Sequence, residues 1–375
     1  MTLIQPENED YRWLLDALGG YGSGDRQEAL VRPSSGQPEL FIPMASPLVA
    51  SASLRRYHDG RSHADRAKTA VALAAARSGL LRFAPGEHVQ AGPFAIVERL
   101  EDELGESDLQ VAITLGPRRR NRKPVLQLIR PDGSTVGFAK VGWSPFTRAL
   151  VGNEAAWLDR FAGHTPTGVA IPRVLASIDE PDRLVVVTSP LTTSPLSGLD
   201  GGLTSDQVVA LARALGSKQA PFAELPQLDT FRAGRVGQLI DLDTLSEKHA
   251  GLSIELGAWH GDLTPWNTST ARGTTLIWDW EFADSDRPVG FDLLHNAFEL
   301  VRRAASRNEQ SALAAVCAKA DSILAPLGQP ANAVVDLYLC ELIQREARLR
   351  GEGWDPLDLG PLEAHAAGLL NGRLS

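Results

Sequence analysis

One short acidic loop, followed by an apolar segment, restricts the fold of this chain more than any other feature. The loop reads His260-Gly261-Asp262-Leu263-Thr264-Pro265-Trp266-Asn267. The apolar segment that follows it, Leu276 to Trp278, has the composition of a buried strand and ends at Asp279. A carboxylate at the end of such a strand is held rigidly. The spacing of Asp262 and Asn267 lets the two side chains face different partners.

These residues have the chemistry that phosphoryl transfer requires. A carboxylate must receive the proton of the attacking hydroxyl, oxygen ligands must hold magnesium against the phosphates, and a cation must bind the nucleotide. Asp262 is our candidate for the base. Asn267 and Asp279 are the candidate magnesium ligands, because magnesium prefers oxygen donors and usually takes only one or two carboxylates from a protein.

The same segments resemble the aminoglycoside phosphotransferase and choline kinase-like family, a branch of the protein-kinase-like fold. The pattern H-G-D-x-x-x-x-N runs from His260 to Asn267, the acid after a hydrophobic strand is Asp279, and Gly290 to Leu293 matches the family segment beneath the catalytic loop. The resemblance covers roughly the last two thirds of the chain. It implies an α+β, bilobal fold with an antiparallel-sheet N-lobe and a mainly helical C-lobe, here preceded by an N-terminal α/β extension.

The pattern divides the chain into three parts. Residues 1–105 form an accessory region outside the family pattern, residues 106–188 a kinase-like N-lobe, and residues 189–375 a mainly helical C-lobe with the catalytic and substrate sites. The elements expected in the accessory region are helices at residues 8–18, at 62–77 and from Pro93, with Ala70, Val71 and Ala74 facing inward in the second, and strands at 40–42 and 80–83. This region could shape the substrate site, form a dimer or bind a partner.

The N-lobe should begin with strands at residues 109–115, 125–130 and 136–141. Lys140 lies inside the third strand, where an ammonium group is costly unless it is paired. The resemblance implies that this lysine contacts the nucleotide phosphates and that a glutamate on the next helix is its partner. Glu154 is the best candidate, with Asp159 nearby.

The loop at residues 116–124 is expected to cover the phosphates, although it is not glycine-rich. Arg118 and Arg119 are candidates for this contact, because guanidinium groups bind phosphate oxygens in bidentate fashion. The alternative is a solvated basic turn without a ligand. After strands at 171–178 and 183–188, the resemblance places the purine-binding hinge at Val187 to Ser189, where backbone groups would bind the base.

Other residues near the motifs have supporting or recognition roles in this interpretation. His260 is expected to support the loop by hydrogen bonding, with Asp292 as a partner, rather than to act in catalysis. Glu281, Asp284 and Asp286 follow the metal strand and could face a cationic or polyhydroxy substrate, or simply be solvated. Weaker candidates on a later helix are Glu341, Arg345 and Glu346.

Two features favour a small-molecule acceptor over a peptide. Many protein kinases have an arginine where this chain has Gly261, and the short run from Asp279 to Asp292 leaves little space for a peptide-docking loop.

The formal net charge of −9 argues against a general nucleic-acid or membrane-surface binder, and agrees with a neutral or cationic substrate. Cys317 and Cys340 fit core thiols, and with no apolar run of membrane-spanning length we expect a cytoplasmic protein.

The leading prediction is therefore a small-molecule kinase that uses magnesium with ATP, or GTP, and an acceptor hydroxyl of a sugar, amino-alcohol or aminoglycoside-like compound. Lys140, Asp262, Asn267 and Asp279 should meet around one cation and its triphosphate. The alternative is a non-catalytic nucleotide-binding scaffold or a partner-binding module, and a protein kinase is disfavoured. The acceptor, the purine and the oligomeric state stay open.

Overall fold

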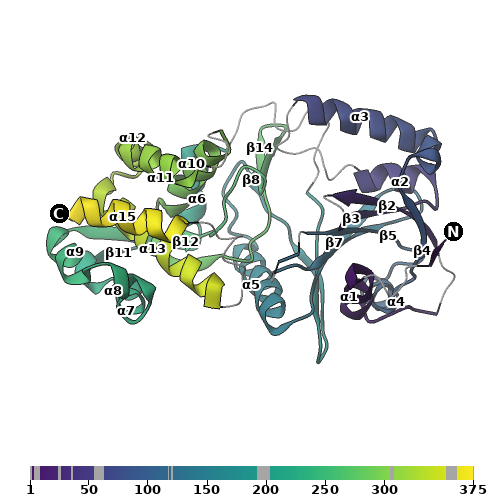
Figure 1. The fold of residues 1–375 in the computed structure, drawn as a ribbon, viewed down its shortest axis with the longest axis horizontal. Coiled ribbons are helices and arrows are strands. Elements are labelled where there is room, and N and C mark those ends of the chain that lie inside the picture. Colours follow the sequence, from purple (N-terminus) through teal and green to yellow (C-terminus); the bar gives the residue numbers. More distant parts are fainter. Residues whose placement is uncertain are drawn as a thin grey trace. The chain divides into compact units, whose positions relative to one another are not determined.

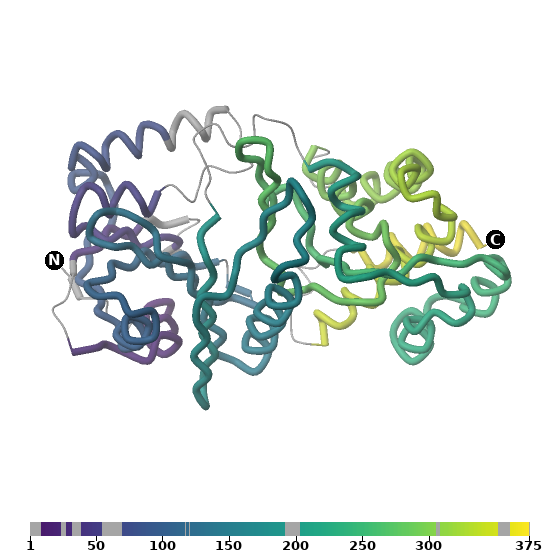
Figure 2. Tube along the Cα trace, turned by 180° about the vertical axis from the view of Figure 1, so that it is seen from behind, coloured from purple at the N-terminus to yellow at the C-terminus, as the bar shows by residue number. Residues whose placement is uncertain are grey.

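The computed structural model forms two compact units. The first contains residues 1–159 and 172–198, and the second contains residues 160–171 and 199–375. The structure describes residues 2–3, 9–23, 27–34, 37–54, 63–116, 118–119, 121–191, 203–304, 308–351 and 361–374. Figures 1 and 2 show the chain from opposite sides, and the helices of the second unit lie in its green to yellow part.

The first unit is built on one nine-stranded sheet, with the strand order β1-β4-β2-β3-β5-β6-β7-β10-β9. Neighbouring strands of the sheet pair antiparallel, except β1 and β4 at one end, which pair parallel. The strands are β1 (Thr2–Leu3), β2 (Gln27–Ser34), β3 (Gln37–Pro43), β4 (Glu87–Ala91), β5 (Gln110–Leu115), β6 (Pro124–Ile129), β7 (Thr135–Gly142), β9 (Val174–Asp179) and β10 (Leu184–Thr188). The helices are α1 (Glu9–Leu18), α2 (Pro47–Leu54), α3 (His63–Arg77), the short 3-10 helix η2 (Leu80–Phe83), α4 (Ala95–Leu104) and α5 (Pro145–Phe161).

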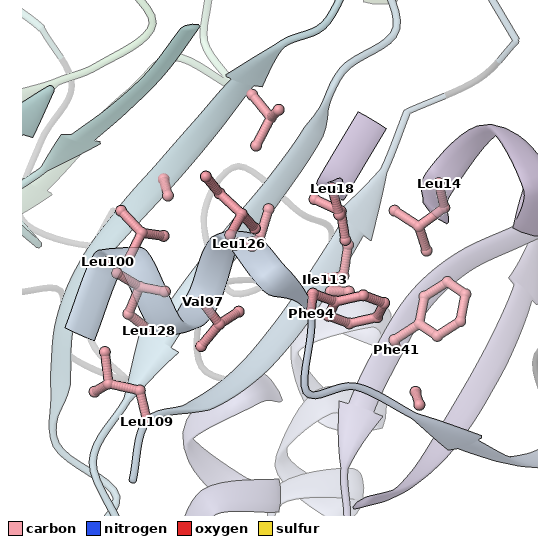
Figure 3. Close-up of a cluster of buried hydrophobic side chains, with 14 of the residues drawn as sticks. Leu14, Leu18, Phe41, Phe94, Val97, Leu100, Leu109, Ile113, Leu126 and Leu128 are labelled. Carbon is pink, nitrogen blue, oxygen red and sulfur yellow. The ribbon is translucent and has the colours of Figure 1, made fainter. Parts of the chain in front are cut away.

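This sheet continues across the boundary that the sequence predicted at residue 105. Strand β3 pairs with β5 through Leu40 opposite Thr114 and Phe41 opposite Ile113. Side chains from α1 and α4 pack with those of the central strands in one apolar cluster, which Figure 3 shows around Phe41, Phe94 and Leu126. The division at 105 stays a prediction of the sequence, but residues on both sides of it share a sheet and a core.

Some predictions for residues 1–105 are confirmed and others are wrong. The helices at residues 8–18 and after Pro93 are present as α1 and α4. The predicted strand at 80–83 is the 3-10 helix η2, which follows Gly79 in a left-handed conformation (φ 73°). In α3, the side chains of Ala70 and Ala74 are exposed and Val71 is 71% exposed, so the predicted inward face is wrong. A helix with alanine on most sides gives little indication of which side is buried.

The second unit combines two small sheets with a set of helices. The sheet orders are β11-β12-β15 and β13-β14-β8. The strands are β8 (Val169–Ala170), β11 (Lys218–Pro221), β12 (Ser253–Trp259), β13 (Thr268–Ala271), β14 (Thr274–Ile277) and β15 (Asp284–Pro288). The helices are α6 (Ser205–Arg213), η3 (Phe222–Glu224), α7 (Pro226–Ala233), α8 (Arg235–Leu239), α9 (Leu242–Lys248), α10 (Phe291–Ala304), α11 (Glu309–Ala318), α12 (Ala320–Leu324), η4 (Ala325–Leu327), α13 (Ala331–Gly351) and α15 (Leu362–Leu374). Helices α13 and α15 run side by side (Figure 1).

The fold class that the sequence predicted is confirmed: the structure is α+β, with an antiparallel sheet in the N-terminal part and helices predominating in the C-terminal part. Between Pro226 and Lys248 the chain forms three short helices, α7, α8 and α9, in place of one long helix. Gly234 ends the first of them, and the side chain of Asp241 caps the third. None of the helices within the described residues is both long and apolar enough to cross a membrane.

Two pairings hold the ends of the acidic loop. Strand β12 leads directly into residue 260, and β15 pairs with β12, with Leu256 opposite Pro288 and Trp259 opposite Asp284. At the far end of the loop, β13 begins and forms an antiparallel pair with β14. The loop is therefore fixed on both sides by strands, although the sequence analysis predicted neither β12 nor β13.

Candidate active site

His260 holds the start of the loop through three hydrogen bonds. Its backbone N–H donates to Asp292 Oδ2 (2.9 Å), and its Nε2 donates to the Trp278 carbonyl (3.1 Å). Its Nδ1 accepts the Asp262 backbone N–H (3.2 Å), which fixes the neutral tautomer. Burial lowers the pKa of His260 to about 4, so the ring is neutral at physiological pH. The structure thus brings His260 and Asp292 together at the base of the loop.

Gly261 is required by the shape of the loop. Its φ angle is +81°, and a Cβ atom there would lie 2.2 Å from the Phe282 carbonyl oxygen. Only glycine tolerates both conditions without strain. The glycine that distinguishes this loop from that of many protein kinases is therefore explained by local packing.

Asp292 lies in the first turn of α10, beneath the loop. Its carboxyl group is 5% exposed, and burial raises its pKa to about 6 against the opposing effect of the His260 N–H. A carboxylate in the first turn of a helix also interacts favourably with the helix dipole. Its position identifies Asp292 as a support for the loop backbone.

Asn267 and Asp262 are joined across the loop. Asn267 Nδ2 donates to the Asp262 backbone carbonyl (2.9 Å) and to Asp262 Oδ2 (3.0 Å). Because these bonds use both hydrogens of the amide, its oxygen is the atom that remains to face a cation. One interaction therefore orients both the candidate base and a candidate metal ligand.

Asp262 remains ionised and partly accessible. Burial raises its pKa, but the hydrogen bond from His295 and the charge of Arg345 more than compensate, so the net shift is downward. The His295 Nε2 to Asp262 Oδ1 distance is 3.4 Å, and the carboxylate side chain is 24% exposed. A group of this kind can accept a hydrogen bond, and then a proton, from an incoming hydroxyl.

Asp279 lies next to this pair. The Trp278 N–H donates to the Asn267 carbonyl (3.1 Å), which ties the residue before Asp279 to the loop. The negative charge of Asp279 raises the pKa of both Asp262 and His260, so the three groups interact electrostatically. Asp279 has a positive φ of 70°, a conformation that is uncommon outside glycine and is often found at functional sites.

Asn267 and Asp279 fit magnesium by their donor chemistry. An amide oxygen and a carboxylate are oxygen donors of the kind this ion prefers, and phosphate and water usually complete its coordination. Among the described ranges, no group of three or more His, Cys, Asp or Glu side chains forms a metal cluster.

The first unit contains the ion pair that the sequence predicted. Lys140 on β7 contacts Glu154 on α5, with Nζ 2.8 Å from Oε1 and 2.6 Å from Oε2. The two side chains are only 12% and 4% exposed. Asp159, the other acid considered, is exposed. The pair holds an ammonium group in the sheet at the position where the resemblance implies a phosphate contact.

Arg118 has a partner that the sequence did not indicate. It donates to Asp10 on α1 from both Nε (3.0 Å) and Nη2 (2.7 Å). Arg122 also donates to Asp10 (2.5 Å) and stacks over Trp13 at 4.3 Å from the ring centroid. These contacts fasten the basic loop to α1, so Arg118 is engaged within the unit. Arg118 and Arg119 are both exposed.

The predicted hinge is also hydrogen bonded within the sheet. Val187 is buried in β10, between β7 and β9. The Ser189 N–H donates to the Arg173 carbonyl (2.8 Å), and its hydroxyl accepts the Arg173 N–H (2.9 Å). The amide of Ser189, which the sequence assigned to the purine, therefore has another partner.

The acids after the metal strand do not form an open acidic surface. Glu281 is buried. Asp284 accepts from Arg287 Nη2 (2.8 Å) and Nε (3.1 Å), and Asp286 pairs with Lys218 (2.6 Å). Arg287 lies three residues after Asp284 on the same strand, and Lys218 lies on β11. A role of these acids in binding a cationic or polyhydroxy substrate stays a prediction.

His295 is not among the residues predicted for the site, and Arg345 was only a weaker candidate. His295 lies one turn after Asp292 on α10, so helical spacing could have indicated that it faces the loop. Its Nδ1 lies 3.0 Å from the Tyr338 hydroxyl, on α13. Arg345, also on α13, donates to the Gly261 carbonyl. No local pattern links α13 to a loop so far away in sequence.

Comparisons with known proteins give limited information. No family model matches the chain, and no curated protein matches it. Among solved structures it is similar to a thermostable mutant of aminoglycoside phosphotransferase APH(4)-Ia in complex with AMP-PNP and hygromycin B, with 12% identity, 75% of this chain and 98% of that chain covered, and a TM-score of 0.46. It is also similar to a protein named as a fructosamine-3-kinase from Haemophilus somnus 129PT, with 13% identity, 73% and 96% covered, and a TM-score of 0.38. Both are of the kind that the motifs resemble, but at these values the likeness assigns no reaction to this chain.

Proposed function

We propose that this chain is a small-molecule kinase of the family that its motifs resemble. It would transfer the γ-phosphate of ATP or GTP to a hydroxyl of a small acceptor such as a sugar, an amino-alcohol or an aminoglycoside-like compound. We place the reaction in the cytoplasm, with neither nucleic acid nor a membrane as partner.

One observation supports this proposal above all others: the double hydrogen bond from the Asn267 amide to Asp262. A metal ligand and a base must have a fixed relation for phosphoryl transfer, because catalysis of this reaction consists largely of positioning and charge stabilisation. A loop with only a structural role has no need of an ionised, partly accessible carboxylate at this point.

In the proposed reaction, Asp262 orients the acceptor hydroxyl. The hydroxyl oxygen forms a bond to the γ-phosphorus while the bond from that phosphorus to the bridging oxygen breaks, and the nucleoside diphosphate leaves with the bonding electrons. The hydroxyl proton passes to Asp262. Bound at Asn267 and Asp279, magnesium would stabilise negative charge on the phosphate oxygens.

The nucleotide contacts are assigned to the first unit. Lys140 would bind phosphate oxygens, with Glu154 keeping its ammonium in place, and Arg119 stays a second candidate. The Ser189 N–H could contribute only if its bond to the Arg173 carbonyl were broken, and Arg118 would have to use guanidinium N–H groups that do not point to Asp10 or Glu9. Backbone groups near Val187 stay a prediction for the purine.

Thermal unfolding with ATP or GTP, with and without magnesium, tests the proposal. Ligand binding should raise the melting temperature of the wild-type protein in a magnesium-dependent way. The Asp279→Ala variant should lose this effect. The Asp229→Ala variant, which removes a surface carboxylate that is 94% exposed, should keep it.

A second candidate function is a non-catalytic nucleotide-binding scaffold or a partner-binding module. The internal bonds of Arg118 and the Ser189 amide favour a chain that binds nucleotide poorly or only as a regulator, because they occupy groups that were expected to bind the nucleotide. Nucleotide stabilisation without a need for magnesium would support the scaffold. No stabilisation by either nucleotide would leave the partner-binding module.

A further inference from the structure

Helix α13 places arginines beside the candidate catalytic loop. Arg345 donates to the Gly261 carbonyl, and its guanidinium lies over the Phe282 ring at 4.8 Å from the centroid. In the sequence, Gly261 directly precedes Asp262 and Phe282 directly follows Glu281. The hydrogen bond and the ring contact fix one end of the guanidinium, and its charge reaches far enough to lower the pKa of Asp262.

Arg348 follows one turn later on the same helix. Residues three apart on a helix are neighbours, and two like charges at that spacing repel each other. Arg348 is exposed, but the surrounding protein removes part of its water and so lowers its pKa. The carboxylate of Glu341 raises that pKa, and the charges of Arg345 and Arg287 lower it again. Glu341, Arg345 and Arg348 are spaced i, i+4 and i+7 along α13 and therefore share one face of the helix. Arg287 donates to Glu341 on that face.

The nearby carboxylates are already used by one of these arginines. Arg287 donates to Asp284 through Nε and Nη2, and to Glu341 through Nη1 (3.1 Å). Glu341 is buried, so its carboxylate has little other access. Within the part of the chain that the structure describes, neither Arg345 nor Arg348 forms an ion pair with a carboxylate.

A simpler role accounts for only part of this arrangement. Basic residues in the last turn of a helix interact favourably with its dipole, which would explain Arg348 and Arg350. It does not explain Arg345, which lies a turn earlier and contacts the loop. It also does not explain why Arg345 and Arg348, neither of which forms an ion pair within the described residues, share one face of α13, with Arg345 beside the candidate base.

We propose that Arg345 and Arg348 bind an anionic group of the acceptor, a carboxylate or a phosphate, while its hydroxyl lies at Asp262. This inference rests on the proposed function and specifies its substrate class: an anionic alcohol, such as a sugar acid or a sugar phosphate. Guanidinium groups suit both anions, because their planar array of donors matches pairs of oxygens. The net negative charge of the whole chain does not oppose this, because recognition depends on the local charges.

The first experiment measures binding without nucleotide. The melting temperature is recorded at constant ionic strength with glucose, glucuronate, glucose 6-phosphate, glycerate, acetate and inorganic phosphate. Hydroxylated anions should stabilise the wild-type protein and glucose should not, and the stronger of the carboxylate and phosphate arms identifies the preferred anion. Arg348→Gln should lose the stabilisation, and Arg232→Gln, which removes a surface charge that pairs with Asp229 and Asp243 on α7 and α9, should keep it.

The second experiment measures phosphate transfer to matched neutral and anionic acceptors. Arg348→Gln should reduce kcat/KM for the anionic acceptor by about 10- to 100-fold, because a hydrogen bond to a charged group is lost. The reduction should appear in KM rather than in kcat, and transfer to a neutral acceptor should not change.

The two experiments separate this inference from the proposed function. If Arg348→Gln and the wild-type protein respond equally to all the anions, or if no anion stabilises the wild type, the inference is overturned even when ATP is bound and transferred. If the anions bind through Arg348 but nucleotide has no magnesium-dependent effect, the anion site stands and the kinase proposal fails.

Discussion

Asp262 and Asp336 are both carboxylates of the second unit with a histidine and an arginine nearby, but their surroundings differ. Asp336, on α13, is fully buried and accepts from Lys248 Nζ (3.0 Å), His249 Nε2 (2.9 Å) and Arg373 Nε. Asp262 is partly exposed. Its histidine is at 3.4 Å, and the nearby arginine donates to a backbone carbonyl rather than to the carboxylate.

The two carboxylates differ in how many hydrogen bonds and ion pairs they receive from other groups of the protein. Burial raises the pKa of both groups, and the pKa of both is nevertheless lowered. At Asp336 three cationic or potentially cationic donors compensate for burial. At Asp262 the nearby arginine is Arg345. Because it donates to the Gly261 carbonyl, it leaves the carboxylate oxygens of Asp262 accessible. A carboxylate whose partners are all internal stabilises the fold, whereas one that remains partly accessible can receive a substrate.

The largest expected effect is on catalysis, in Asp262→Asn. Phosphate transfer should fall by about 10²–10⁴-fold, because the amide cannot accept the hydroxyl proton. The melting temperature should change little, because an amide oxygen at this position can still accept the hydrogen bond from Asn267 Nδ2 and the His295 contact at 3.4 Å is weak. Turnover with a screened acceptor and thermal unfolding measure the two effects. Full turnover in this variant would contradict the assignment of the base, and Asp229→Asn serves as the control.

Asp336→Asn should lower stability and leave catalysis unchanged, which is the opposite of Asp262→Asn. Removing this charge leaves Lys248, Arg373 and His249 without their carboxylate, and breaking a buried pair in this way costs about 3 kcal/mol. Urea unfolding should show this loss, while turnover per folded molecule stays the same. The matched control is Asp243→Asn, whose carboxylate is 86% exposed. An unchanged unfolding free energy would mean that the Asp336 network is not a stabilising one.

The smallest expected effect is a pH dependence of the difference in unfolding free energy between the wild type and Asp336→Asn. The pKa of Asp336 is lowered in the folded state, so its contribution to stability is complete above the ordinary value of 3.8. It is lost as the pH falls through the lower folded value, because the unfolded chain takes up the proton first. The difference in unfolding free energy between the wild type and Asp336→Asn should therefore narrow below about pH 4. A constant difference would contradict the assigned shift.

Several parts of the candidate site could be predicted because they are local. The loop from His260 to Asn267, the acid after the strand and the lysine in an apolar strand are each readable from a few neighbouring residues. The pairing of Lys140 with Glu154 could also be predicted, because an ammonium group in a sheet needs a partner and the family resemblance implies a glutamate on the next helix. The roles of these residues in catalysis stay predictions.

Other parts depended on segments that meet only in the folded chain. Arg118 reaches Asp10, Asp286 reaches Lys218, and the Gly261 carbonyl accepts from Arg345. No spacing pattern indicates any of these pairs, and the internal partners of Arg118 and Asp286 could therefore not be predicted. Strand β12 was not predicted either. The inward face of α3 was wrong for a related reason, since an alanine-rich helix has no strong apolar side.

By itself, the sequence determined which residues have the chemistry of phosphoryl transfer and that the fold is α+β, because motifs and strand patterns depend on short-range order. Only the tertiary structure decided which charges are neutralised inside the protein and which keep access to solvent. An ionisable group is defined by the partners around it, and those partners come from distant parts of the chain. For this reason the pairing of Asp286 with Lys218, and the position of Arg345 beside the candidate base, could be seen only in the folded chain.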